Sequence, residues 1–192
     1  MRQVLGYLYC MALAAAIGLG LTWMSLNQGL ALGALQIGAW VAQPKAGTAE
    51  VDPYARAEFE RGGWLPVGLG DGVAFIAKTD DKGRLLDGRC EVTVSGVTPQ
   101  ARYYTLSLYD STGKLVANSI GRNGFTSQEL VREGDGKFTV TVSPRARPGN
   151  WLPTSGIERY LLALRLYDTP IGIATRTGRE SPMPSVVTGQ CS

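Results

Sequence analysis

The feature that most constrains this chain is an uncharged apolar run near its N-terminus. From Val4 to Leu26 the sequence VLGYLYCMALAAAIGLGLTWMSL has 23 residues without a formal charge. At about 1.5 Å per residue, a helix of this length crosses a hydrocarbon core of roughly 30 Å. We therefore expect residues 1–29 to form a transmembrane anchor whose partner is the lipid bilayer.

The charges beside this run predict its orientation. Arg2 and the amino terminus are positive on one side, and the next basic residue on the other side is Lys45. Positive flanks stay in the cytosol, so we expect an inner-membrane protein with a cytosolic N-terminus and a periplasmic domain. The main alternative is a cleaved signal peptide, but its apolar region is about 7 to 15 residues long.

A second apolar stretch, Leu30 to Val41, is too short to be a second span of ~20 residues. We expect residues 30–50 to be an apolar membrane-proximal linker. If the stretch instead pairs with the first as a helical hairpin, the following domain faces the cytosol. We also expect that removing residues 1–43 deletes no core element.

Residues 51–192 are expected to form one β domain. The chain has 25 glycines and ten prolines, a composition that favours a body rich in turns and strands. Asp52-Pro53 is a helix start signal, and Gly62-Gly63 stops this short helix after Arg61. Alternating runs then predict five strands, which are GVAFIAKT from Gly72, CEVTVSG from Cys90, YYTLSLYD from Tyr103, KFTVTV from Lys137 and YLLALRLYD from Tyr160.

This pattern predicts an all-β fold, a jelly-roll-like two-sheet sandwich with one short N-terminal helix, preceded by a single transmembrane helix. The turn at residues 80–83 is expected to close a hairpin between the first two strands. Further short strands are expected near Leu115–Asn118 and near the C-terminus.

Several short blocks resemble those of a known family. They are Asp52-Pro-Tyr-x-Arg56-Ala, Leu65-Pro-x-Gly-x-Gly70, the TLSLYD strand, NWLPT from Asn150 and LRLY from Leu164. In this order they resemble the domain-of-unknown-function family numbered 1214, and the layout with an apolar span is similar to its short, membrane-anchored alphaproteobacterial branch. The resemblance implies a jelly-roll-like fold and no established activity. Longer relatives carry a companion domain, numbered 1254, in front of this one.

Two cysteines, Cys90 and Cys191, lie outside the apolar run. In an oxidising periplasm two such thiols in a small domain are more often paired than free, which predicts a Cys90–Cys191 disulfide. The alternative is two unrelated reduced thiols, which a cytosolic domain would contain.

The sequence contains candidates for binding but no recognisable catalytic constellation. Histidine is absent, so we expect no metal site, no cofactor and no catalytic triad. Asp110 and Asp168 end two similar strands and are either paired carboxylates for glycoside chemistry or ordinary turn residues. Arg165 is either a solvated outer residue or a buried partner for a carboxylate.

The segment around Trp151 is the other candidate for binding. Asn150 and Trp151 stand before Leu-Pro, where an indole either stacks on a sugar or apolar ligand or fills the core. Asn150, Trp151, Arg165, Asp110 and Asp168 are therefore the candidate ligand-binding residues.

These observations favour a membrane-tethered periplasmic module that binds or assembles with an envelope protein or glycan. The alternatives are an envelope glycan-acting enzyme that uses Asp110 and Asp168, and a small-ligand carrier with a pocket of Trp151 and tyrosines. The formal charge of +3 without a basic patch gives no reason to expect nucleic acid as a partner.

Overall fold

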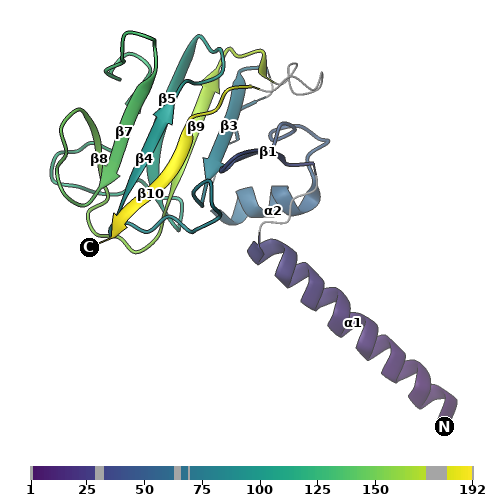
Figure 1. Ribbon diagram of the computed structural model, residues 1–192. Coiled ribbons are helices and arrows are strands. Elements are labelled where there is room, and N and C mark those ends of the chain that lie inside the picture. The colour runs from purple at the N-terminus through teal and green to yellow at the C-terminus, as the bar shows by residue number, and fades with distance from the viewer. Residues whose placement is uncertain (1, 29–32, 63–65, 69, 172–180, 192) are drawn as a thin grey trace.

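The fold was described on a computed structural model that covers residues 2–28, 33–62, 66–68, 70–171 and 181–191. A long helix, α1 (Arg2–Gln28), projects away from a β-rich body that contains the C-terminal end of the chain (Figure 1). Within α1, the segment Gln3–Leu26 has a mean hydropathy of 2.0, and none of it is buried against the body. The helix is therefore long and apolar enough to span a membrane.

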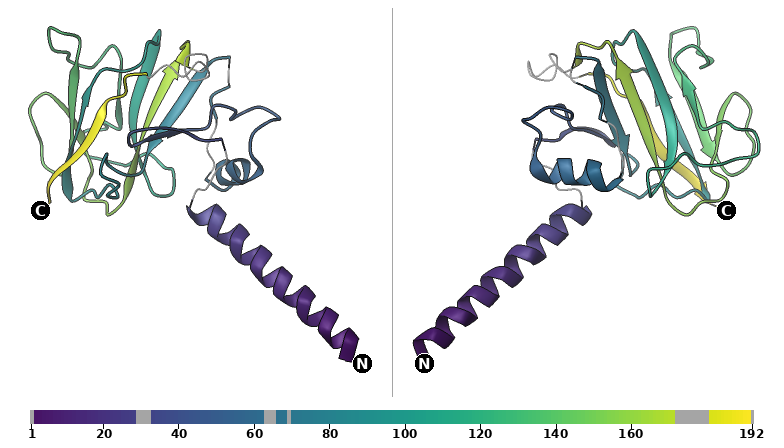
Figure 2. Two further views of the ribbon diagram at one scale, coloured as in Figure 1. Left: turned by 45° about the vertical axis from the view of Figure 1, so that its right-hand side comes forward. Right: turned by 180° about the vertical axis from the view of Figure 1, so that it is seen from behind.

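The body consists of two β-sheets that face each other (Figure 2). The six-stranded sheet has the order β1-β2-β3-β9-β5-β6, and the four-stranded sheet has the order β10-β4-β7-β8. All neighbouring strands are antiparallel except β7 and β8, which are parallel. The strands are β1 (Leu35–Ile37), β2 (Trp40–Ala42), β3 (Gly72–Ala77), β4 (Cys90–Gly96), β5 (Tyr103–Asp110), β6 (Gly124–Thr126), β7 (Phe138–Ser143), β8 (Asn150–Pro153), β9 (Tyr160–Tyr167) and β10 (Ser185–Cys191).

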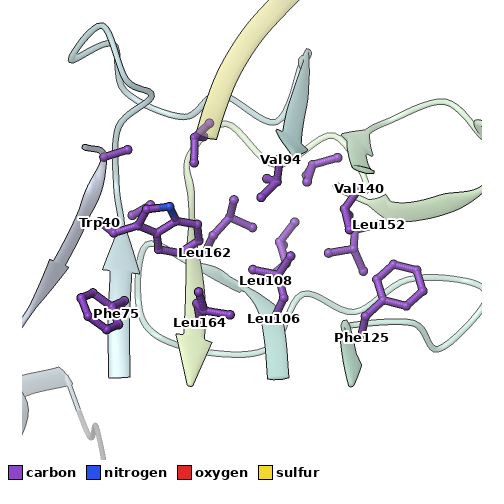
Figure 3. Packing of buried hydrophobic residues seen from close by; sticks show 14 of the residues in the cluster. Trp40, Phe75, Val94, Leu106, Leu108, Phe125, Val140, Leu152, Leu162 and Leu164 are labelled. Atoms are coloured by element: carbon purple, nitrogen blue, oxygen red, sulfur yellow. The ribbon is translucent and has the colours of Figure 1, made fainter. Parts of the chain in front are cut away.

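The five strands that alternation predicted are β3, β4, β5, β7 and β9, and all five are confirmed. Their alternate side chains point into the space between the sheets, as Figure 3 shows for Leu162 and Leu164 of β9 and for Leu106 and Leu108 of β5. Trp40 and Phe75 lie at one end of this core, and Phe125 lies at the other. The hydrophobic effect of this shared layer holds the two sheets together.

The short helix α2 (Pro53–Gly62) also forms where the sequence predicts it. The Asp52 carboxylate accepts a hydrogen bond from the backbone N–H of Ala55 at 3.0 Å, which is the N-cap interaction that this residue type favours. An ion pair between Glu58 of α2 and Lys78 (2.8 Å) places the helix beside the end of β3.

The expected linker at residues 30–50 is wrong for its central part. Residues 30–32 lie outside the described residues, but Leu35–Ile37 and Trp40–Ala42 form a hairpin at the edge of the six-stranded sheet. Trp40 is completely buried, and its indole N–H donates to the carbonyl of Pro184 at 2.7 Å. The apolar residues of this stretch belong to the core of the sandwich. Each strand is only three residues long, which is too short for its alternation of buried and exposed residues to be recognised in the sequence.

The turn at residues 80–83 does not join β3 to β4 as a hairpin, because these strands belong to different sheets. It closes a small loop of its own, in which the buried Asp80 carboxylate accepts hydrogen bonds from the backbone N–H groups of Lys82 (3.0 Å) and Arg84 (2.9 Å). The Arg84 guanidinium also pairs with Asp80 at 2.7 Å. The chain uses this turn to cross from one sheet to the other.

Short strands were harder to place than long ones. Near Leu115–Asn118 there is an isolated bridge between Tyr109 and Leu115 in place of a strand. The expected strand near the C-terminus is confirmed as β10, whereas β6 and β8 were not predicted.

The expected disulfide between Cys90 and Cys191 is confirmed. It joins β4 to the end of the edge strand β10 across 101 positions of sequence. Cross-linking so large a loop restricts the unfolded chain, and the chain-entropy estimate gives an upper value of about 4.7 kcal/mol.

The structure predicts that the sandwich needs its N-terminal hairpin. A chain starting at residue 33 should fold with the stability of the full body. A chain starting at residue 44 loses Trp40 and should have a free energy of unfolding lower by about 3 to 5 kcal/mol or more, the usual effect of removing a buried tryptophan. Urea denaturation followed by circular dichroism measures this difference.

In the full chain, Trp40→Ala should reproduce most of this loss, and Trp40→Phe, which keeps a ring but loses the N–H donor to Pro184, should cost less. Equal stability of the two truncated chains would show that the hairpin is not part of the cooperative core.

The buried Asp80 predicts a dependence of stability on pH. Burial raises the pKa of this carboxyl, but the hydrogen bonds from Arg84 and Lys82 outweigh burial and lower the pKa from 3.8 to about 2. Its contribution, at most about 2.5 kcal/mol, is therefore present above about pH 4 and is lost as the pH falls towards 2. The difference in unfolding free energy between wild type and Asp80→Asn should shrink across this range.

Guanidinium denaturation of the detergent-solubilised chain at pH 7, 4 and 2 measures the difference. Glu60→Gln, at an exposed position of α2, is the control and should differ little from wild type. A wild-type advantage over Asp80→Asn that is unchanged at pH 2 would contradict the assigned interaction.

Candidate functional site

Three of the five candidate binding residues belong to one pair of strands. Asp110 ends β5, Asp168 follows β9, and Arg165 lies within β9. The other two, Asn150 and Trp151, lie on β8 in the opposite sheet. The structure therefore divides the candidates between two surfaces.

Asp110 is a turn residue. One of its carboxylate oxygens accepts hydrogen bonds from the Thr112 hydroxyl (2.7 Å), the Thr112 N–H (2.8 Å) and the Lys114 N–H (3.0 Å). The Thr112 hydroxyl and these backbone groups hold the pKa of Asp110 below its ordinary value. The carboxylate stabilises the loop after β5, as an Asx turn does.

Asp168 lies at the other end of the strand pair. The register places Asp110 opposite Tyr160, whereas Tyr167, the neighbour of Asp168, lies opposite Tyr103. Seven residues at about 3.4 Å each separate the two ends by about 24 Å. Glycoside hydrolysis requires carboxyl groups about 5 to 9.5 Å apart, so of the two alternatives the paired carboxylates do not fit this separation.

Arg165 lies on the outer face of the six-stranded sheet, the face away from the core. It stands opposite Thr105, and its guanidinium reaches along the strands to Tyr109, donating to the phenol oxygen at 2.8 Å. The guanidinium carbon is 5.2 Å from the centre of the Tyr109 ring, which is a cation–π contact. The pair spans the row of Ser107 and Ala163 in the register, and Ala163 is completely buried.

The charge of Arg165 is not neutralised within the described part of the chain. Its cross-strand neighbours are Ala74 and Thr105, whose short side chains carry no charge. No carboxylate of the described residues forms an ion pair with it. Arg165 is therefore neither the fully solvated residue nor the buried carboxylate partner that the sequence suggested, but a half-buried cation held by a tyrosine.

Two further tyrosines lie on the same face, beyond Arg165. Tyr103 and Tyr167 are directly opposite each other on β5 and β9, with ring centres 6.0 Å apart, and both are half-buried. At their end of the face, Asp168 is exposed and lies 3.9 Å from Arg102. Within the residues that the structure describes, the outer face of β5 and β9 thus presents three tyrosines and Arg165, which forms no ion pair with any of them.

The β8 candidates have a different role. The Asn150 side chain donates to the carbonyls of Val131 (2.8 Å) and Thr139 (3.0 Å) and accepts from the Val131 N–H (2.9 Å). Both N–H groups of this buried amide are in use within the protein. The side chain therefore holds β8 to its neighbours and leaves no amide donor for a ligand.

Trp151 is half-buried on the outer face of the four-stranded sheet, where its indole N–H donates to the carbonyl of Ser143 at 3.0 Å. Leu152, the next residue, points into the core. Trp151 and the tyrosines of β5 and β9 belong to different sheets and different outer faces. They do not line one pocket, as the small-ligand carrier would require.

The described residues contain no group of three or more Cys, Asp or Glu side chains that could hold a metal ion. The two surfaces above are thus the places where the predicted residues can meet a ligand. The face of β5 and β9 is the better candidate because it combines aromatic rings with a charge that no carboxylate in the described part of the chain compensates.

The family model described as "Protein of unknown function (DUF1214)" matches residues 71–171, more than half of the sequence. The chain belongs to this family. The matched segment runs from the start of β3 to just past β9 and includes both candidate surfaces. The resemblance seen in the short sequence blocks is confirmed.

A solved structure has a similar fold, and a second is reported for comparison. The VPA0106 protein from Vibrio parahaemolyticus has a TM-score of 0.57 and 16% identity, with 76% of this chain and 37% of that chain covered. A putative uncharacterized protein from Burkholderia cenocepacia has a TM-score of 0.45 and 17% identity, with 81% and 36% covered. The chain spans little more than a third of the length of either protein. Comparison with curated proteins finds no match.

The tyrosines of this face were not individually predicted as site residues. A signal was present, because Tyr103, Thr105, Ser107 and Tyr109 alternate with buried residues and so share a face. The residues of β9 that lie beside these side chains are set by the register between β5 and β9, and this register could not be derived from the sequence.

The geometry of Asn150 predicts a structural phenotype. Asn150→Ala removes the three hydrogen bonds that this buried amide makes to Val131 and Thr139, so we expect a loss of about 2 to 4 kcal/mol in unfolding free energy. Gln128→Ala changes an exposed amide in the loop between β6 and β7 and should change the unfolding free energy by less than about 0.5 kcal/mol. Thermal and urea denaturation measure both. An Asn150→Ala protein as stable as the control would show that the amide is free for another role.

Proposed function

We propose that this protein is a membrane-anchored binding module of the bacterial cell envelope, with its β domain on the periplasmic side of the inner membrane. The observation that carries the proposal is the combination of an exposed apolar helix with a disulfide-closed β body. Helix α1 ends at Gln28 and β1 begins at Leu35. Seven peptide units reach at most about 25 Å, so the body stays close to the membrane surface.

The disulfide supports the periplasmic side. Bonds such as Cys90–Cys191 persist in oxidising compartments, whereas cytosolic thiols are kept reduced. The positive N-terminus with Arg2 favours the same orientation. Both arguments are independent of the identity of any ligand.

The geometry favours binding over glycan hydrolysis. Asp110 and Asp168 are too far apart for paired-carboxylate chemistry, and Asp110 is engaged in its own turn. The outer face of β5 and β9 offers half-buried rings and a cation, which suit the recognition of an envelope protein or glycan.

This proposal predicts the result of a topology measurement. Alkaline phosphatase fused after residue 192 should be active, and a fluorescent protein that matures in the cytosol should be dark at the same position. In native membranes of a Cys10→Ser variant, Cys90 and Cys191 should react with a maleimide only after reduction. Inactive phosphatase, a bright reporter and freely reactive thiols would place the domain in the cytosol and overturn the proposal.

A further inference from the structure

On the outer face of β5 and β9, the charged side chain of Arg165 is held in place by Tyr109 but has no counter-ion among the described residues. The Arg165 guanidinium lies against the Tyr109 ring and uses one N–H group for the phenol oxygen. A guanidinium has five N–H donors in a planar fork, so several remain on its solvent side. The tyrosine fixes the direction of this fork and reduces the entropy lost when a ligand binds.

The natural ligand of such a fork is a planar anion. Carboxylates match it with two parallel N–H···O bonds, and contacts of this kind are stronger than those between neutral groups. Because the side chains of Ala74 and Thr105 beside Arg165 are short, they leave room for a ligand carboxylate to approach the guanidinium from the direction of the next row of residues on β5 and β9, away from Tyr109.

That next row is aromatic. Tyr103 and Tyr167 form a pair of rings at the end of the same face. The guanidinium lies near the Ser107–Ala163 row, four residues along the strands from this pair, a separation of about 14 Å. Short side chains, those of Thr105 and Ala74, occupy the sheet between them. The distance suits a short oligosaccharide better than a single sugar.

Aromatic rings that are open on one face bind the C–H faces of sugar rings through apolar contact, while their hydroxyl groups stay in water. Among the described residues, the charges beside the tyrosine pair are Asp168 and Arg102, which lie 3.9 Å apart, and the exposed Asp71, whose backbone carbonyl accepts a hydrogen bond from the Asp168 N–H at 2.9 Å. Two carboxylates and one guanidinium do not attract an anionic group. A neutral part of the ligand therefore fits over the tyrosines, and its acidic part fits at Arg165.

We propose that the outer face of β5 and β9 binds an acidic oligosaccharide, with a sugar carboxylate on Arg165 and a sugar ring on Tyr103 and Tyr167. This rests on the proposed function, since it names the ligand class of a binding module. A stable protein partner buries about 800 Å² on each side, whereas two strands about 5 Å apart, over six residues of about 3.4 Å each, offer roughly 200 Å².

The test uses the full chain purified in detergent micelles and tetragalacturonic acid as the probe. Its methyl ester, which has the same rings without charge, is the matched ligand. Isothermal titration should detect binding of the acid, and the ester should bind at least about tenfold more weakly, because bonds to a charged group contribute about 1.5 to 3 kcal/mol. Inorganic phosphate should compete poorly because it does not reach the tyrosines.

Variants separate the two halves of the site. Arg165→Gln should weaken binding of the acid at least about tenfold, Arg165→Lys should recover part of the loss, and Tyr167→Ala should weaken acid and ester alike. Arg145→Gln removes an exposed charge after β7 on the other sheet and should leave binding unchanged. Thermal melts of each variant establish that it is folded.

Three results would overturn the proposal. They are equal binding of acid and ester, equal binding by folded Arg165→Gln and wild type, and no binding of the acid at millimolar concentration. Competition by phosphate at equal affinity would also reject it in favour of a general anion site. A periplasmic, oxidised domain that fails these tests retains the proposed function, whereas a cytosolic, reduced domain loses it whatever the titration shows.

Discussion

The sandwich depends on the contact between its first strands and its last. The carboxylate of Asp81 accepts hydrogen bonds from the Ala39 N–H (3.2 Å), in the turn of the β1–β2 hairpin, and from the Val186 N–H (2.8 Å) in β10. Trp40 adds its bond to the Pro184 carbonyl. These contacts join an edge of the six-stranded sheet to an edge of the four-stranded sheet, so the two sheets share more than the apolar layer between them.

The disulfide completes this closure at the far end of β10. Strand β10 pairs with β4 alone, and such an edge strand has few other contacts to hold it. Asp81 fixes its start and Cys191 fixes its end. The β1–β2 hairpin, which Asp81 and Trp40 join to this edge, is also the first part of the body after α1, so a pull from the membrane acts first on these contacts.

The sequence reveals elements that are long and periodic, and it misses those that are short. Strands of six to eight residues, such as β5 and β9, give a clear alternation, and the capped helix α2 has its own start and stop signals. The β1–β2 hairpin has three residues per strand, so its apolar residues could not be told from a membrane-proximal segment. The assignment of β3 and β4 to different sheets is likewise set by packing across the core, which no local pattern contains.

The candidate site shows the same limit at the level of single side chains. Alternation places Arg165 on the outer face, as the sequence indicated, but its partner Tyr109 is opposite Leu161, four residues away along β9. Long side chains lean along a strand, so their contacts depend on the register and on what lies between them. Here the residues between are Ser107 and Ala163, and a larger residue at either position would displace the guanidinium from the ring. The small residues beneath the pair are thus as much a part of the site as the charge above them.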